Sequence, residues 1–196
     1  MTKDIAPPDS ARREEVLELA YRYVLDRGMT GLSLRPLATA VGSSPRVLLF
    51  LFGSKDELVR ALLARARADE LALLERLRGS GEADELPEVA AAVWRWLAAA
   101  EHRPLLRLWA EGYARSLVEP DGPWAGFAQA TVVDWLELLA SAQPPAARDT
   151  EAGVADRTLT LAVLRGALLD LLATDEVERA TAAVDRHLHR GRRLMR

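Results

Sequence analysis

The segment from Leu32 to Leu58 constrains the fold of this chain more than any other part of it. Ser33 is a suitable N-cap for a short helix, and Gly42 can end that helix in a left-handed conformation. Ser44 followed by Pro45 then places a capping serine directly before a proline at the first helical position. Two short helices joined by a glycine-containing turn form a helix-turn-helix, a geometry that sets the second helix into the DNA major groove.

The same segment resembles the helix-turn-helix of the TetR family of bacterial transcriptional regulators. The family pattern has Thr or Ser before the second helix, then Ile-Ala, a Gly-Val-Ser turn, Leu-Tyr, Phe and Ser-Lys-Glu. The matching positions here are Ser33, Leu37, Ala38, Gly42, Ser44, Leu48, Phe52, Ser54, Lys55 and Leu58. The rest of the chain agrees with the family only in size and helicity. The alternative is an αα-hairpin inside an ordinary helical domain.

Composition favours an all-α protein that stays in the cytoplasm. Hydrophobic residues make up 49% and charged residues 28% of the 196 residues, as in globular proteins. Strand formers are sparse, and no alternating apolar run appears. The chain has no cysteine, which excludes disulfides, thiolate metal sites and a cysteine nucleophile. The polar start is not a signal peptide, and we expect no membrane span.

Apolar periodicity and helix caps predict nine helices. Besides the two motif helices, they cover about residues 10–27, 55–78, 84–100, 104–118, 124–142, 149–173 and 175–191. The resemblance implies a DNA-binding domain over residues 1–54. It implies a ligand-binding and dimerisation domain over residues 55–196. A net charge of −3 does not by itself indicate a nucleic-acid partner.

The eighth expected helix is apolar almost all round from Leu159 to Leu172. Such a helix has more apolar surface than one subunit is expected to cover. In the TetR family the last two helices of each subunit form a four-helix dimer interface, so the resemblance implies a homodimer. The expected interface residues are Leu161, Leu164, Leu168, Leu171, Leu172, Val184 and Leu188.

The resemblance assigns DNA contacts to the second motif helix and its surroundings. The positions that match base-contacting residues are Pro45, Arg46, Val47, Leu49 and Phe50. Phosphate contacts are expected from Ser33, Arg35, Ser44 and Lys55. Arg46 can either bind guanine O6 and N7 or contact a phosphate, and Val47 can touch a thymine methyl group.

This chain departs from the family within that helix. Leu49 replaces the usual Tyr, and the run from Val47 to Phe52 contains no side-chain hydrogen-bond donor. Leu49 and Phe50 could face DNA, or they could pack on the first or fourth helix. In either case we expect fewer phosphate contacts than in the family.

The aromatic residues of the C-terminal part suggest a ligand pocket. In the TetR family an effector binds among the corresponding helices, and pockets are mostly apolar. The candidate pocket residues are Trp94, Trp109, Tyr113, Phe127 and Trp135. Aromatic residues at helical spacing also commonly form a core. The effector expected here is a small apolar or aromatic molecule.

Enzyme motifs are absent from the sequence. It contains no glycine-rich phosphate loop and no nucleophile motif, and His187 and His189 are poorly spaced to share a metal ion. We therefore expect no catalytic residue, metal or cofactor. The function expected from the resemblance is a repressor that a small molecule releases from a pseudo-palindromic operator in double-stranded DNA. The alternative is a helical ligand- or partner-binding protein with weakened DNA binding.

Overall fold

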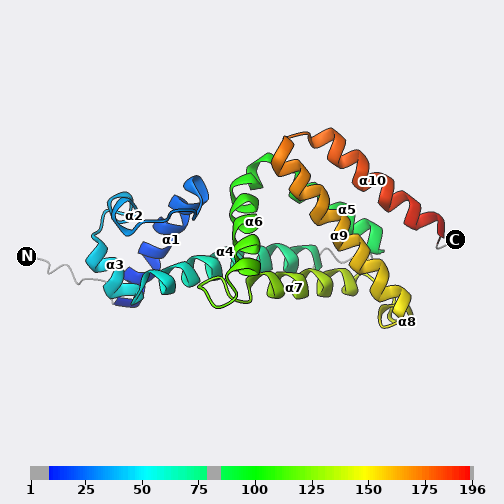
Figure 1. The fold of residues 1–196 in the computed structure, drawn as a ribbon. Coiled ribbons are helices and arrows are strands. Elements are labelled where there is room, and N and C mark those ends of the chain that lie inside the picture. Colours follow the sequence, from blue (N-terminus) through cyan, green and yellow to red (C-terminus); the bar gives the residue numbers. More distant parts are fainter. Residues whose placement is uncertain (1–8, 79–84, 195–196) are drawn as a thin grey trace, which may run out of the picture. The chain divides into compact units, whose positions relative to one another are not determined.

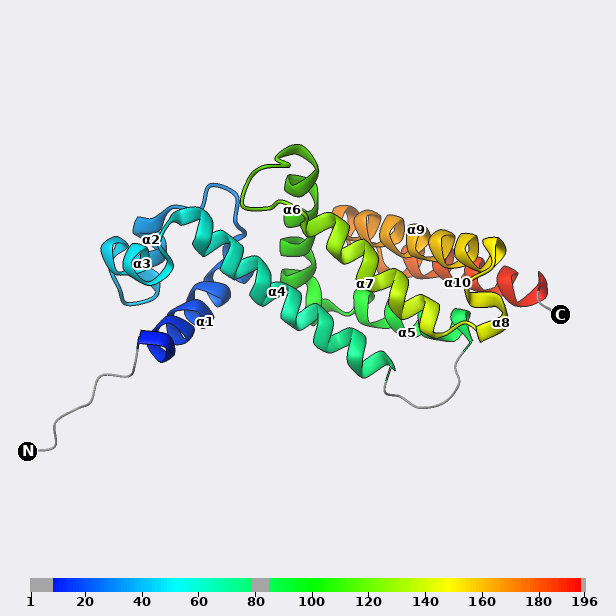
Figure 2. The ribbon, with the colours of Figure 1, turned by 90° about the horizontal axis from the view of Figure 1, so that it is seen from below.

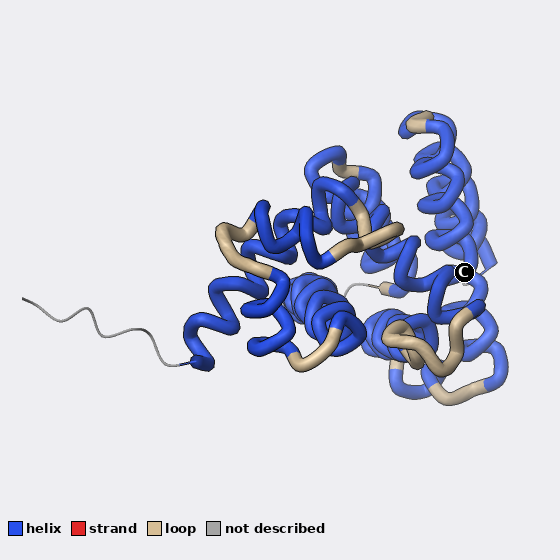
Figure 3. The backbone as a smooth tube through the Cα atoms, turned by 60° about the vertical axis from the view of Figure 1, so that its left-hand side comes forward, coloured by secondary structure: helices blue, strands red, loops and turns tan. Residues whose placement is uncertain are grey.

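The computed structural model describes residues 9–78 and 85–194 and confirms the all-α prediction. Within these ranges the chain consists of helices and loops, without a strand (Figure 1, Figure 3). The helices are α1 (Asp9–Arg27), α2 (Leu34–Ala40), α3 (Pro45–Phe52), α4 (Lys55–Arg78), α5 (Leu86–Ala98), α6 (Arg103–Val118), α7 (Phe127–Ser141), α8 (Pro145–Arg148), α9 (Glu151–Thr174) and α10 (Val177–Leu194). A single 3-10 turn, Ala100–His102, precedes α6.

The described part of the chain has one more α-helix than the nine predicted. The extra element is α8, a single turn that Pro145 begins. Proline is favoured at this position because its fixed φ suits a helix and its missing N–H is not needed there. The sequence predicted only a break at Pro144 and Pro145.

The chain forms two compact units. Among the described residues, unit 1 comprises 9–68 and 108–128, and unit 2 comprises 69–78, 85–107 and 129–194. Unit 1 therefore contains the first part of α4 and most of α6 in addition to α1, α2 and α3. This physical division differs from the predicted functional division into residues 1–54 and 55–196, which stays a prediction.

The first three helices pack against one another in unit 1 (Figure 2). Leu37 of α2 and Leu48 of α3 are almost fully buried, together with Val16 of α1. Between α2 and α3 the chain turns at Gly42, whose φ of 63° suits glycine. These contacts build the helix-turn-helix that the sequence predicted.

Arg65 attaches the first part of α4 to α1. Its guanidinium donates from Nε to Glu18 and lies over the ring of Tyr21, 4.7 Å from the ring centroid. A partly buried arginine that has both a carboxylate and an aromatic partner fixes the direction of a helix better than an exposed ion pair does.

Unit 2 is built around α5, α9 and α10, which pack against one another. Figures 1 and 2 show α9 and α10 side by side as an antiparallel hairpin. Trp94 of α5 is buried, and its indole N–H donates to Thr181 Oγ1 of α10 at 3.0 Å. Leu164 and Val184 fill the adjacent core.

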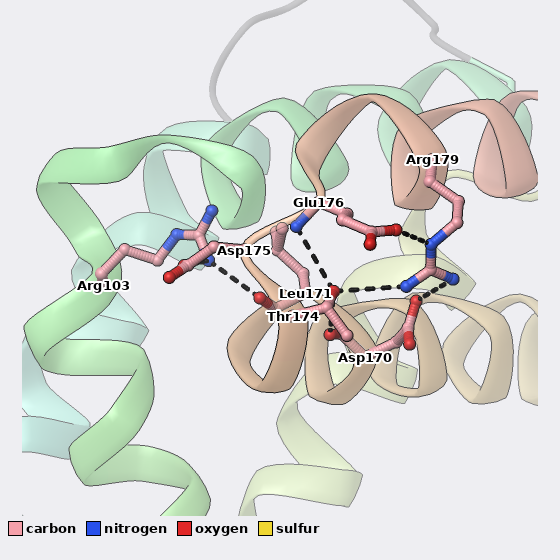
Figure 4. Close-up of polar contacts among 7 residues, drawn as sticks. All are labelled: Arg103, Asp170, Leu171, Thr174, Asp175, Glu176 and Arg179. Carbon is pink, nitrogen blue, oxygen red and sulfur yellow. Dashed lines mark hydrogen bonds and ion pairs between the residues drawn. The ribbon is translucent and has the colours of Figure 1, made fainter.

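Arg103 closes the turn between α9 and α10 (Figure 4). Its side chain is buried and donates from Nη1 to the Leu171 carbonyl at 3.3 Å and to Asp175 Oδ1 at 3.4 Å. Asp175 has a left-handed φ of 57°, which ends α9. The Leu171 carbonyl also accepts the Asp175 N–H, so Arg103 adds a second hydrogen bond at the C-terminal end of α9, where a cation is favoured.

On the exposed side of the same turn, Arg179 joins the two helices (Figure 4). Its Nη1 lies 2.7 Å from Asp170 Oδ2, and its Nε forms an ion pair with Glu176. The hydrogen bonds that Arg179 donates to the carboxylates of Asp170 and Glu176 raise its pKa above the usual range. Both ion pairs are solvent-exposed, so they add little to the free energy of unfolding. Their role is to fix the geometry of the turn.

Candidate nucleic-acid interface

Local signals at both ends define α3. Ser44 is the N-cap, and its Oγ accepts a hydrogen bond from the Val47 N–H at 3.3 Å. Pro45 occupies the first helical position. Gly53 ends the helix with a φ of 84°, and its N–H donates to the Leu49 carbonyl at 2.8 Å. The cap at Ser44 confirms the start of the helix that the sequence predicted, and Gly53 adds its end.

Ser33 occupies the corresponding position before α2 but behaves differently. Its backbone is extended, as at an N-cap, yet its side chain makes no capping hydrogen bond. Its exposed hydroxyl is available to a partner outside the chain. The predicted phosphate contact is compatible with this geometry and stays a prediction.

The helical period divides the side chains of α3 between two faces. Leu48 and Phe52 lie four residues apart and are buried. Phe50 lies on the opposite face, and 73% of it is exposed. Val47 and Leu49 are 38% and 41% exposed. Phe50 therefore does not pack in the core of unit 1, and its predicted position facing DNA stays a prediction.

The remaining predicted DNA-contacting residues lie on the surface of unit 1. Pro45 is half-buried, and the exposed residues are Ser33, Arg35, Ser44, Arg46 and Lys55. No acidic residue occurs between Asp26 and Asp56. This stretch includes α2 and α3, so the basic side chains there face no acidic neighbour from their own segment. An excess of positive charge over such a segment suits a polyanionic partner.

Sequence reasoning missed Arg13 of α1. Its Nε donates to the Leu51 carbonyl at 3.2 Å, and its guanidinium lies 4.9 Å from the centroid of the Phe52 ring. A cation at the C-terminal end of a helix is favoured by the helix dipole. Arg13 thus holds the end of α3 against α1. The partners lie 38 residues apart, so no local pattern could have identified the contact.

Sequence reasoning also missed that Glu111 of α6 binds the turn between α1 and α2. Its carboxylate accepts the Met29 N–H at 2.9 Å and the Thr30 hydroxyl, both in the turn between α1 and α2. Arg115 Nε lies 3.6 Å from the same carboxylate. Gly28, with a φ of 74°, brings the turn close to Glu111. This contact attaches α6 to the helix-turn-helix within unit 1.

The predicted pocket residues do not form one group. Trp109 and Tyr113 of α6 are half-buried in unit 1, with ring centroids 5.1 Å apart. Phe127, also in unit 1, is buried against Gly112. Trp94 and Trp135 belong to unit 2, where both are buried and donate their indole N–H to Thr181 and Glu70, respectively. A pocket lined by these residues stays a prediction.

The predicted dimer residues lie mostly inside unit 2. Those buried in the core are Leu161, Leu164, Leu168, Leu171, Val184 and Leu188, whereas Leu172 is half-buried. The reason is that α5 and α10 already cover that side of α9. A different side of α9 is exposed and includes Leu159 at 55% and Leu169 at 54% exposure. The face of α9 that the sequence predicted as a dimer interface therefore lies mostly in the core of unit 2. The exposed face of α9 is a different one.

An open apolar groove follows this free face of α9. Its lining residues are Asp149, Glu151, Val154, Ala155, Thr158, Leu159 and Ala162.

Among the described residues no cluster of His, Asp and Glu is arranged to hold a metal ion. None of the described helices has the length and apolarity needed to cross a membrane.

Solved structures share this arrangement of helices. A TetR-family transcriptional regulator of Rhodococcus sp. superposes with a TM-score of 0.70 at 20% identity, covering 91% of this chain and 97% of the other. The chain has the TetR-family fold. The multidrug binding protein EbrR, complexed with proflavin, has a TM-score of 0.61 at 26% identity, covering 90% of this chain and 99% of EbrR. The resemblance predicted from the sequence is confirmed at the level of this TetR-like fold.

Curated relatives match only part of the TetR-like chain. An HTH-type transcriptional regulator of Mycobacterium tuberculosis is 33% identical over 41% of this chain and 35% of the relative. The HTH-type transcriptional regulator BetI of Rhizobium meliloti is 30% identical over 46% of this chain and 51% of the relative. The matches therefore span about half of these relatives or less. No family model matches the chain.

The two serines that precede α2 and α3 should differ in their effect on stability. Ser44→Ala removes the hydrogen bond to Val47 and should lower the free energy of unfolding by about 1 kcal/mol. Ser33→Ala is the matched control and should change it little, because the Ser33 side chain makes no capping bond. Urea unfolding of both variants measures the difference. Equal losses for the two variants would contradict the assignment of caps.

Proposed function

We propose that this protein is a TetR-like transcriptional regulator that binds double-stranded DNA through α3. The observation that carries the proposal is the outward face of α3. This short helix is capped at both ends, is anchored by Leu48 and Phe52, and exposes Arg46 in a segment without acidic residues. A helix held in this way is suited to enter the major groove with its N-terminal residues at the base edges.

The basic residues have two roles in this proposal. Arg46, in the first turn of α3, lies where a guanidinium can bind guanine O6 and N7. Arg35 and Lys55 lie in the first turns of α2 and α4 and contact phosphates, which fix the position of the protein without sequence information. The segment without acidic residues gives the helix-turn-helix its affinity for the negatively charged DNA.

Arg46→Ala and Lys55→Ala should weaken DNA binding in different ways. Loss of Arg46 should cost about 1–3 kcal/mol and relax the preference at one position of the binding site. Loss of Lys55 should weaken binding to all sequences equally and reduce the slope of log affinity against log salt by about one unit. Salt titrations with a selected site and with scrambled DNA measure both effects.

Arg95→Ala is the matched control for this experiment, because Arg95 is an exposed arginine of α5 in unit 2. It should leave DNA binding unchanged. If neither Arg46→Ala nor Lys55→Ala alters affinity, α3 does not dock on DNA. The helical ligand- or partner-binding alternative would then be the better description.

The regulator is proposed to act as a homodimer through the exposed stripe of α9. This stripe consists of Ala155, Leu159, Ala162, Gly166 and Leu169, which are all exposed. Their spacing of four and three residues places them on one face of the helix. The small residues allow a partner helix to approach closely, and the two leucines provide apolar area. Two copies of α9 and α10 would then bury the stripe.

Leu159→Arg should convert the dimer to a monomer without unfolding it. Leu159 is 55% exposed in the single chain, so an arginine there meets solvent in the monomer but an apolar surface in the dimer. Leu117→Arg, at a position of α6 that is 66% exposed, is the control and should remain dimeric. Sedimentation at micromolar concentration distinguishes the two. A monomeric unmodified protein would rule the dimer out.

A small aromatic cation is the proposed effector class. EbrR, the similar protein of known structure, is complexed with proflavin. In this chain Trp109 and Tyr113 are the pocket candidates that retain exposed surface, whereas Trp94 and Trp135 are buried with bonded indole groups. Stacking on Trp109 is the simplest way for the chain to hold a flat cationic ring.

Trp109→Ala should weaken proflavin binding at least tenfold relative to the unmodified protein, as expected from losing about 1.4 kcal/mol of aromatic contact. Trp96→Ala is the control, because Trp96 is a half-buried tryptophan of α5 that stacks on His102 at 4.0 Å. Proflavin fluorescence anisotropy measures the affinity. Equal affinity of all three proteins would place any effector elsewhere.

Repression follows if the effector and DNA favour different spacings of the two helix-turn-helix motifs of the dimer. A dimer binds two half-sites only when its recognition helices match successive turns of the major groove. An effector that prefers another spacing lowers DNA affinity by shifting the population between the two states. The pseudo-palindromic operator mirrors the two-fold symmetry of the dimer.

A further inference from the structure

The outward face of α3 combines one cation with apolar side chains. Phe50 lies at its centre, Val47 precedes it by three residues and Arg46 by four, so the three side chains are neighbours on the helix surface. All three are exposed, and Phe50 is the most exposed of the large apolar residues of α3. A helix that entered the major groove in this orientation would present mainly apolar surface to the base edges.

Apolar side chains have one specific partner in the major groove. The edges of guanine, cytosine and adenine present hydrogen-bond donors and acceptors, whereas thymine adds a C5-methyl group. Placing Phe50 against donors and acceptors alone would remove water from them without replacing its hydrogen bonds, which is unfavourable. Placing it against a methyl group buries apolar surface on both sides.

We propose that Phe50 and Val47 give this protein a preference for thymine by contacting its methyl group, beside a base pair that Arg46 contacts. This inference rests on the proposed DNA-binding function and specifies how the same site selects its sequence. The exposed phenyl and isopropyl groups contribute by exclusion of water, and the guanidinium contributes by hydrogen bonds.

The charge around these apolar residues favours DNA over an apolar protein surface as their partner. Arg35, Arg46 and Lys55 are exposed nearby in the sequence, and no acidic residue interrupts the segment from Arg27 to Lys55. A protein partner that covered Phe50 would have to bury or neutralise these cations. The phosphates that flank a major groove neutralise them directly.

The test removes the methyl groups from the DNA and leaves the protein unchanged. A binding site is first selected from random duplexes, and each thymine of its half-sites is then replaced by deoxyuridine. Binding should become about fourfold weaker for each contacted methyl group removed. Replacement by 5-bromodeoxyuridine, whose bromine fills the place of the methyl group, should restore the affinity. Deoxyuridine outside the half-sites should have no effect.

A variant of the protein supplies the second arm of the test. Two duplexes that differ only in having thymine or deoxyuridine at the position that Phe50 contacts should bind the Phe50→Ala variant with equal affinity. The substitution should not unfold the protein, because 73% of Phe50 is exposed. Leu117→Ala, at another exposed apolar position, should keep the full difference between the two duplexes.

The outcomes separate this inference from the proposed function. Sequence-specific binding that deoxyuridine does not weaken, or selected half-sites without thymine, would overturn the thymine preference and leave the DNA-binding regulator intact. Absence of any sequence preference would overturn both. A loss on deoxyuridine that persists in Phe50→Ala and Val47→Ala would overturn the assignment to these residues.

Discussion

The burial of Leu48 and Phe52 is the interaction on which the proposed site depends. With eight residues, α3 is too short to be stable alone, so tertiary packing must hold it. Anchoring two side chains four residues apart also fixes the rotation of the helix, because the helical period then places Phe50 on the opposite face. Arg13, bonded to the Leu51 carbonyl, holds the C-terminal end of the same helix.

Two charged side chains connect α1, α2 and α3 to the rest of unit 1. Arg65 of α4 binds Glu18 of α1, and Glu111 of α6 binds the backbone and a side chain of the turn before α2. Trp109 lies two residues before Glu111 on α6. An effector that moved this part of α6 would therefore act directly on the hydrogen bonds at the Met29 N–H, which lies beside the helix-turn-helix.

The two sides of α9 explain why an apolar helix can serve two purposes. One side supplies Leu164 and Leu168 to the core of unit 2, and the other leaves Leu159 and Leu169 exposed between small residues. Apolar residues in the core stabilise the single chain, whereas the exposed stripe is the side of α9 that remains available for the proposed association. The same helix thus connects stability of the subunit with the proposed assembly of the dimer.

The sequence alone determined the elements whose causes are local. Ser44, Pro45 and Gly42 act within one turn of their own position, so the helix-turn-helix could be predicted from them. The all-α fold could be predicted from composition and from the apolar periodicity of each helix. Long-range packing decided the rest. It chose which side of α9 is buried, it turned Phe50 toward solvent, and it placed the predicted pocket residues in two units. The contacts of Arg13 and Glu111 join segments 38 and 82 residues apart, where a side chain's partner depends on how helices pack and not on its neighbours in the chain.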